Sequence, residues 1–195
     1  MSPDDRRAAL IDATVPLLHR CGVEVSTRQI AQAAGVAEGT IFGVFPDKDS
    51  LLVAAMLREL DPRPTIAAIR AIDPGAGLRA RLVIAAELVN DRFTRNVHLL
   101  NGARKLVLAS GRHPEAAARM AASRGDLQAA LTELVLPDAA LLRRAPEAVA
   151  SLLLLFCGAN TFGPFGSPER FDGEEMVSLL LDGLLVSSST DHGGA

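Results

Sequence analysis

The side chains that most often carry catalysis are few and scattered in this chain. Its four histidines show no metal-ligand spacing: His19, His98, His113 and His192. No glycine-rich phosphate loop and no nucleophile elbow occurs in the sequence. We therefore expect a protein that is not an enzyme and that uses no metal and no cofactor.

The two cysteines, Cys21 and Cys157, lie far apart, which argues against a disulfide framework and fits a reduced compartment. The first ten residues, MSPDDRRAAL, are charged and lack the apolar core of a signal peptide. Residues 148–163 are strongly apolar but too short for a membrane span, so a buried helix is the better interpretation. These features predict a cytoplasmic protein without a membrane partner.

Small-molecule binding is a second kind of chemistry that the middle of the chain could support. His98, Asn101 and Arg104 share one helix face among apolar neighbours. A pocket with a few convergent polar groups is the ordinary form of such a site, although a solvated stripe would give the same pattern at least as often. The candidate ligand-binding residues are Phe93, His98, Asn101, Arg104 and Met120.

The most informative stretch is 26–50, STRQIAQAAGVAEGTIFGVFPDKDS. Ser26 and Gln29 have the spacing of a capping box, and Gly35 is placed to end the helix that they begin. A second short helix is predicted over 37–44, because Phe45-Pro46 must stop it. Two helices joined by a short turn with a glycine are typical of a helix-turn-helix, whose second helix enters the DNA major groove. A plain helical hairpin in a bundle is the alternative.

Three side chains of this stretch suit contact with DNA. Arg28, near the start of the first helix, can reach a phosphate or a base edge, or it can simply pair with Glu24. Gly39 allows close approach of the second helix. Thr40 offers a hydroxyl and a methyl group, which suit a phosphate or a thymine methyl.

Four short motifs closely resemble the amino-terminal module of the TetR family of transcriptional regulators. They are Arg28-Gln29-Ile30-Ala31, Ala34-Gly35-Val36, Gly39-Thr40-Ile41-Phe42 and Phe45-Pro46-Asp47-Lys48. The resemblance covers about 6–57, and the remainder matches only in length and helical pattern.

This resemblance implies an all-α fold with about nine helices. Residues 1–48 would form a three-helix DNA-binding domain, and 49–195 a ligand-binding and dimerisation domain. It also implies a homodimer that binds a palindromic double-stranded operator and responds to a small-molecule effector. The DNA-binding residues that it suggests are Arg28, Glu38, Gly39, Thr40, Phe42, Gly43 and Lys48, of which Lys48 matches a phosphate-contacting position.

The sequence departs from the family pattern at several contact positions. Phe42 replaces the usual tyrosine and so lacks its hydroxyl, and Glu38 would repel phosphates unless it accepts a hydrogen bond from a cytosine amino group. Residues 1–50 hold five Arg and Lys against seven Asp and Glu, a net charge of 5 − 7 = −2. These features favour sparse phosphate contacts, or weakened DNA binding.

The last two predicted helices, 146–161 and 172–186, are apolar on more than one side, so each must bury more than one side. A central pair of core helices would satisfy this, but a dimer interface explains it better. Its candidate residues are Leu152, Leu155, Phe156, Met176, Leu180 and Leu184.

Two functions of different class therefore compete. The leading hypothesis is a ligand-responsive repressor that a small molecule releases from its operator. The alternative is a protein that binds or sequesters a small molecule on the same scaffold, with weakened DNA binding.

Overall fold

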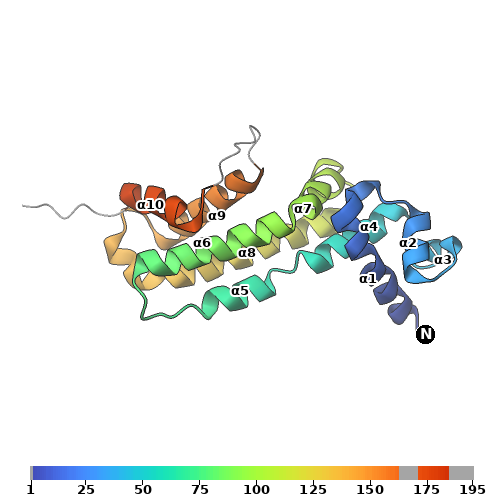
Figure 1. The fold of residues 1–195 in the computed structure, drawn as a ribbon, viewed down its shortest axis with the longest axis horizontal. Helices are drawn as coiled ribbons and strands as arrows, with labels where there is room; N and C mark the ends of the chain where they lie inside the picture. The colour runs from blue at the N-terminus through green and yellow to red at the C-terminus, as the bar shows by residue number, and fades with distance from the viewer. Residues whose placement is uncertain (1, 163–170, 185–195) are drawn as a thin grey trace, which may run out of the picture. The chain divides into compact units, whose positions relative to one another are not determined.

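The computed structural model describes residues 2–162 and 171–184. Within those ranges the regular structure is entirely helical, which confirms the predicted all-α fold (Figure 1). The chain divides into two compact units: unit 1 comprises 1–62 and 94–125, and unit 2 comprises 63–93 and 126–195. These units describe packing. The predicted functional boundary between residues 48 and 49 stays a prediction.

Unit 1 begins with four helices and a short 3-10 turn. They are α1 (Pro3–Cys21), η1 (Gly22–Glu24), α2 (Thr27–Ala34), α3 (Glu38–Phe42) and α4 (Lys48–Glu59). Its later part holds α7 (Val97–Ala103), a stretch of π-helix, η2 (Arg104–Ala109), and the first residues of α8 (Pro114–Val135). The helix predicted over 37–44 is shorter than expected, because glycine at position 43 is a poor helix former.

Local capping explains where the helices of unit 1 begin. Ser2 and Asp5 form a capping box at α1, and Ser26 and Gln29 form another at α2. The Asp47 carboxylate accepts the backbone N–H of Ser50 at 2.7 Å and so caps α4. Each cap satisfies a backbone donor that has no partner within its own helix.

One hydrophobic core holds unit 1 together. It includes Leu10 and Leu18 from α1, Ile30 from α2, Ile41 from α3 and Leu52 from α4, each at most 1% exposed. Burial of side chains of this size stabilises the fold by roughly 1.5–3 kcal/mol each. The core therefore fixes α2 and α3 against α1 and α4.

Helix α7 packs closely against η1 and α4 at Gly102. A Cβ atom built on Gly102 would lie 2.7 Å from Cγ1 of Val23 and 2.9 Å from Cε of Met56. Real Cβ atoms almost never come this close, so with any larger residue the side chains of Val23 and Met56, or α7 itself, would have to shift.

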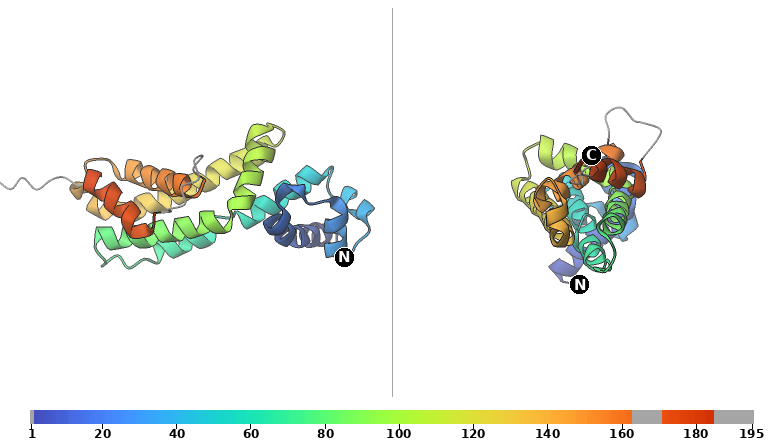
Figure 2. Two further views of the ribbon diagram at one scale, coloured as in Figure 1. Left: turned by 45° about the horizontal axis from the view of Figure 1, so that its top comes forward. Right: turned by 90° about the vertical axis from the view of Figure 1, so that its left-hand side faces the viewer.

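Unit 2 is a second helical bundle. It contains α5 (Arg63–Arg70), α6 (Leu78–Arg95) as far as residue 93, the later part of α8, the 3-10 helix η3 (Leu136–Leu141), α9 (Pro146–Phe162) and α10 (Gly173–Leu184). Asp172 and Glu175 form a capping box at the start of α10. Both views of Figure 2 place α10 beside α6.

Polar side chains as well as apolar ones join the helices of unit 2. The amide nitrogen of Asn90 lies 3.6 Å from the sulfur of Met176, and Arg79 pairs with Asp182 at 3.3 Å, so two contacts link α6 to α10. Arg81, which is buried, pairs with Asp138. Within residues 2–162 and 171–184, no helix combines the length and the hydropathy that a membrane crossing requires.

Candidate nucleic-acid interface

The turn between α2 and α3 has the geometry that the sequence predicts. Gly35 takes the left-handed conformation with φ 67°, and its N–H bonds to the carbonyls of Ala31 and Gln32. The N–H of Val36 also bonds to the carbonyl of Ala31, at 3.0 Å. A residue with a side chain would be strained at this φ, so the glycine sets the angle at which α3 leaves α2.

Helix α3 presents a small, exposed surface. Ile41 is fully buried and anchors the helix, while the Phe42 ring is 53% exposed. Glu38, Gly39 and Gly43 are exposed, and Thr40 is half-buried. A Cβ atom at Gly39 would meet no atom within 4 Å, so this glycine leaves open space outside the helix. The predicted contact residues of α3 therefore lie on surface that a groove could receive.

Glu38 has a partner that the sequence does not reveal. The hydroxyl of Thr27, the first residue of α2, donates to Oε1 of Glu38 at 2.5 Å. The bond joins residues eleven positions apart, and both lie at the start of their helices. It links α2 to α3 on their exposed side.

Arg28 makes no ion pair in the part of the chain that the structure describes. Glu24, its suggested partner, instead lies 3.4 Å from the Nζ atom of Lys105. The exposed guanidinium of Arg28 is thus available to a phosphate or a base edge.

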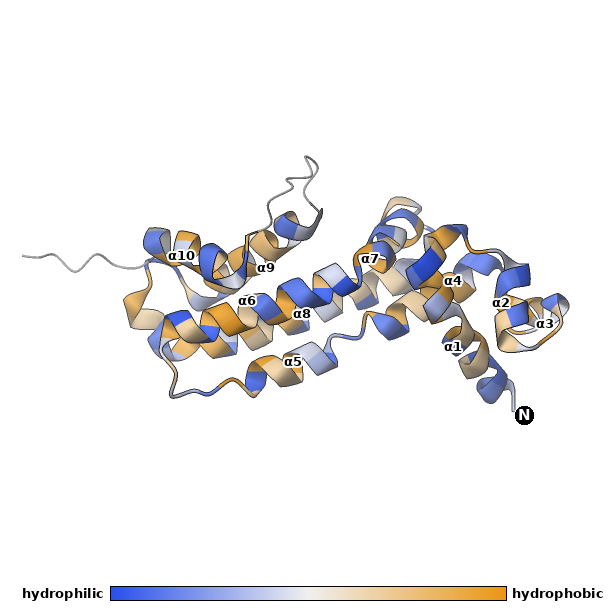
Figure 3. Cartoon of the chain, viewed as in Figure 1, coloured by the Kyte–Doolittle hydropathy of each residue, from blue (hydrophilic) through white to orange (hydrophobic). Residues whose placement is uncertain are grey.

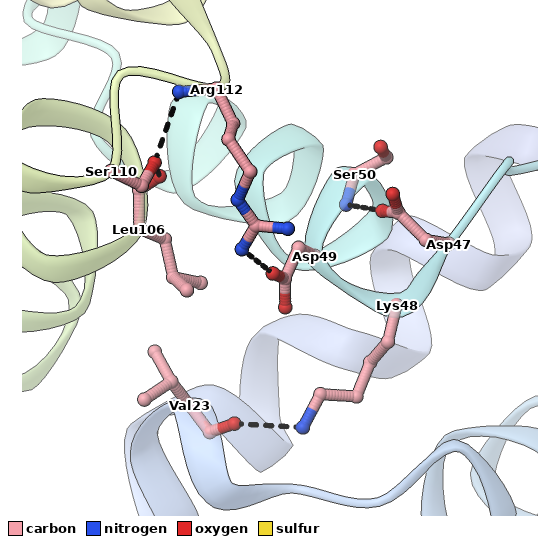
Figure 4. Close-up of polar contacts among 8 residues, drawn as sticks. All are labelled: Val23, Asp47, Lys48, Asp49, Ser50, Leu106, Ser110 and Arg112. Atoms are coloured by element: carbon pink, nitrogen blue, oxygen red, sulfur yellow. Dashed lines mark hydrogen bonds and ion pairs between the residues drawn. The ribbon is translucent and has the colours of Figure 1, made fainter.

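Lys48 is already engaged (Figure 4). Its ammonium donates to the carbonyl oxygen of Val23 at 3.1 Å and to that of Val25 at 3.0 Å. These carbonyls belong to the connection between α1 and α2, so Lys48 ties that connection to the start of α4. Two of its three N–H donors are taken, and the predicted phosphate contact must use the third.

The start of α4 is also tied to the segment before α8, as Figure 4 shows. Arg112 pairs with Asp49 at 2.5 Å, and the N–H of Arg112 bonds to the hydroxyl of Ser110 at 3.2 Å. The carboxylate of Asp47 accepts a hydrogen bond from the backbone N–H of Ser50. This bond is the largest of the effects that lower the pKa of Asp47 below its ordinary value. Arg112 and His113 lower the pKa of Asp47 a little further through their charge.

The predicted ligand-binding residues do not gather around one cavity. His98, Asn101 and Arg104 are exposed on α7 and at the start of η2, and Met120 packs partly against the core of unit 1. Phe93 belongs to unit 2 and packs partly against that core. A cavity of about 210 Å³ exists in unit 2, between α5, α6, α8 and η3, but none of the five residues lines it. The ligand-binding site stays a prediction.

The candidate dimer residues on α9 and α10 differ in exposure. Leu155 is 61% exposed and Leu152 is also exposed, whereas Phe156 and Leu180 are half-buried. Met176 is 0% exposed and lies in the core of unit 2, so it could not contact a partner subunit directly and could only pack beneath residues that do. The side chain of Leu184 lies outside the described residues.

Sequence reasoning did not include two further apolar residues near this surface. Leu179 of α10 is 58% exposed, and the exposed Phe171 ring stacks on Phe156 with ring centroids 5.9 Å apart. Figure 3 shows apolar residues along both α9 and α10. Leu179 lies within the apolar run from which the interface was predicted, so its apolar type could have indicated it from the sequence. Only the structure shows that its side chain is exposed.

Two short helices joined by a glycine turn, with the second helix exposed, define a helix-turn-helix DNA-binding protein. Comparison with known proteins identifies this amino-terminal module. Residues 10–55 match the sequence profile of the family described as bacterial regulatory proteins, tetR family. Residues 10–55 therefore carry the amino-terminal module of the TetR family of transcriptional regulators.

Two curated relatives match this amino-terminal part. One is the HTH-type transcriptional repressor KstR of Rhodococcus jostii, 43% identical over 58 residues, which cover 29% of this chain and 27% of that protein. The other is the HTH-type transcriptional regulator BetI of Yersinia pestis, 42% identical over 81 residues, which cover 38% of this chain and 41% of that protein. The chain thus spans less than half the length of either curated relative.

A solved structure extends the likeness of fold to nearly the whole chain. It is a transcriptional regulator from Saccharomonospora viridis in complex with choline, with a TM-score of 0.71 and 17% identity. The superposition covers 94% of this chain and all of that one. At this identity the likeness concerns the fold alone.

Proposed function

We propose that the chain is a homodimeric repressor of transcription that binds a palindromic operator and leaves it when a small-molecule effector binds. The observation that carries this is the exposed surface of α3, anchored by the buried Ile41 and set at an angle by Gly35. A matching half-site in each subunit would place two copies of α3 in major grooves about 34–36 Å apart, or a multiple of that.

Residues 1–48 would contact DNA through Arg28, Glu38, Gly39, Thr40, Phe42, Gly43 and Lys48. Residues 49–195 would bind the effector and form the dimer, in which Leu152, Leu155 and Leu179 supply exposed apolar surface. Exposed leucines on adjacent helices favour a protein partner, because water contact with apolar side chains is unfavourable. The effector would act by favouring a dimer whose half-site spacing no longer fits the operator.

A second candidate is a protein that binds a small molecule and has little affinity for DNA. Glu38 places a negative charge on α3, and Lys48 has two of its three donors bound within the protein. Both features reduce the attraction of this surface for phosphates.

Selection of bound sequences from a random duplex pool separates the two candidates. A repressor of the proposed kind enriches an inverted repeat, and its affinity for that repeat falls with rising salt. The proposal would be contradicted if the protein enriched no sequence. It would also be contradicted if the enriched sequence lacked two-fold symmetry. Affinity is then measured for the enriched repeat and for a random duplex of the same length. The two values give the ratio of specific to non-specific affinity.

A further inference from the structure

Glu38 carries the only charged side chain of α3, whose five residues are EGTIF. An ionised carboxylate accepts hydrogen bonds and donates none. Its Oε1 atom is held by the hydroxyl of Thr27 at 2.5 Å, while Oε2 has no hydrogen bond among the described residues. The exposed surface of α3 therefore offers one negatively charged acceptor, fixed in place by a neighbouring helix.

The edges of the four bases differ in how they would meet such an acceptor. In the major groove guanine shows two acceptors and thymine shows one acceptor and a methyl group, so both repel a carboxylate. Adenine shows a donor, but its N7 acceptor lies beside it. Cytosine alone shows an amino donor without an acceptor of its own next to it.

We propose that Glu38 determines specificity by selecting cytosine at one position of each half-site, with Oε2 accepting a hydrogen bond from the N4 amino group. Thr27 acts as a positioning residue, because its hydroxyl holds the carboxylate in one rotamer before DNA binds. This inference rests on the proposed function, since it requires α3 to lie in the major groove.

The negative charge of α3 would then help to discriminate between DNA sequences. A carboxylate at this surface weakens attraction to phosphates on every sequence alike. It discriminates between sequences only where a base donor satisfies it, because a carboxylate that loses water without gaining a partner is strongly unfavourable. Glu38 would therefore lower non-specific affinity and raise the ratio of specific to non-specific affinity.

The test begins with the operator that the wild-type protein selects from a random duplex pool. Each cytosine of the half-site is replaced in turn by each of the other bases. The affinity of wild type, Glu38→Gln and Thr27→Val is then measured for every resulting duplex. Glutamine keeps the acceptor for Thr27 and adds an amino donor, the combination that pairs with adenine N6 and N7. We expect wild type to prefer cytosine by about tenfold at one position, and Glu38→Gln to prefer adenine there.

Two further arms isolate the hydrogen bond. N4-methylcytosine at that position replaces the groove-facing hydrogen with a methyl group, so wild type should lose about the same tenfold. Thr27→Val keeps the shape of the side chain and removes the hydroxyl. It should reduce the preference for cytosine several-fold without changing which base is preferred.

Glu115→Gln is the matched control for loss of one negative charge, since Glu115 is an exposed residue of unit 1 in the first turn of α8. It should leave the base preference unchanged. If Glu38→Gln binds the selected operator with the wild-type order of base preference at every position, Glu38 reads no base and the inference is overturned while the proposed function stands. If wild type selects no sequence at all, the proposed function itself fails.

Discussion

Replacement of Lys48 by methionine tests whether its ammonium holds the connection between α1 and α2. Methionine keeps most of the length of the side chain and removes the charge and all three donors. The carbonyl oxygens of Val23 and Val25 then lose partners at 3.1 and 3.0 Å. Val25 is fully buried, so its carbonyl has little chance of finding water instead.

The size of the effect follows from these two bonds. A hydrogen bond from a charged group contributes about 1.5–3 kcal/mol when well buried. Lys48 is half-buried, so we discount each bond to about 1 kcal/mol, which gives about 2 kcal/mol for the pair. For a protein of this length that loss lowers the melting temperature by roughly 4–8 °C.

Thermal unfolding followed by circular dichroism measures this shift, and Arg119→Met provides the control. Arg119 is exposed on α8 in unit 1, and no interaction of its guanidinium is present in the described structure. Its replacement removes one positive charge and should leave the melting temperature unchanged. An unchanged melting temperature for Lys48→Met as well would refute the reasoning from the two carbonyls.

The same variant also tests the predicted phosphate contact. If the third N–H of Lys48 meets a phosphate, Lys48→Met weakens binding equally on all duplexes and lowers the salt slope by about 0.9. If the ammonium acts only within the protein, the melting temperature falls and the slope does not. The two roles therefore differ in an observable that unfolding does not affect, provided binding is measured well below the melting temperature.

Three further predictions concern other parts of the chain. Leu155→Arg or Leu179→Arg should give a monomer with native helix content in sedimentation, because both side chains are exposed; a clean dimer from either variant would argue against the α9–α10 surface. Asp47→Ala should cost about 1 kcal/mol at neutral pH through loss of the cap. Because the folded pKa of Asp47 lies below its ordinary value, this difference from wild type should shrink as the pH falls below about 4, and a constant difference would contradict the cap. Burial raises the pKa of Cys157 to about 12, so a thiol reagent at about pH 8 should titrate only the exposed Cys21 in the native protein and both cysteines in denaturant.

The helix starts of this fold were accessible from the sequence because capping is local. Ser26 with Gln29, and Asp172 with Glu175, each involve residues three positions apart. The position of Gly35 likewise predicts a turn, since few other residues tolerate the left-handed φ that it adopts. The helix-turn-helix could therefore be predicted nearly residue by residue.

The partners of the charged residues could not be predicted in this way. Lys48 reaches Val23 across 25 positions, and Thr27 reaches Glu38 across eleven. No periodicity marks such pairs, because they depend on how α2, α3 and α4 meet in space. The sequence therefore assigned Lys48 and Glu38 to DNA alone, while the structure gives each a partner within the protein.

Helices with apolar residues on more than one side limited the prediction of the interface. Met176 and Leu179 both lie in the apolar run of α10, but the first is buried in the core of unit 2 and the second is exposed. Hydropathy alone does not tell which side of such a helix faces its own core. Of the predicted residues, Leu152 and Leu155 are exposed and could contact a partner subunit, as could Leu179, which the prediction omitted.

The distribution of positive charge sets how this surface can hold DNA. The guanidinium of Arg7 lies 4.3 Å from the centre of the Phe45 ring, and Lys48 is bound to two carbonyls, so both cations already contact the protein. Arg28 is the cation of α2 and α3 that no side chain neutralises within the described residues, and Glu38 opposes it. If α2 and α3 supply few phosphate contacts, they would give a shallow salt dependence and weak binding by a single subunit. On the proposed function, affinity would then come from base contacts and from simultaneous engagement of two half-sites, and the proposed dimer through α9 and α10 would be a condition for tight DNA binding.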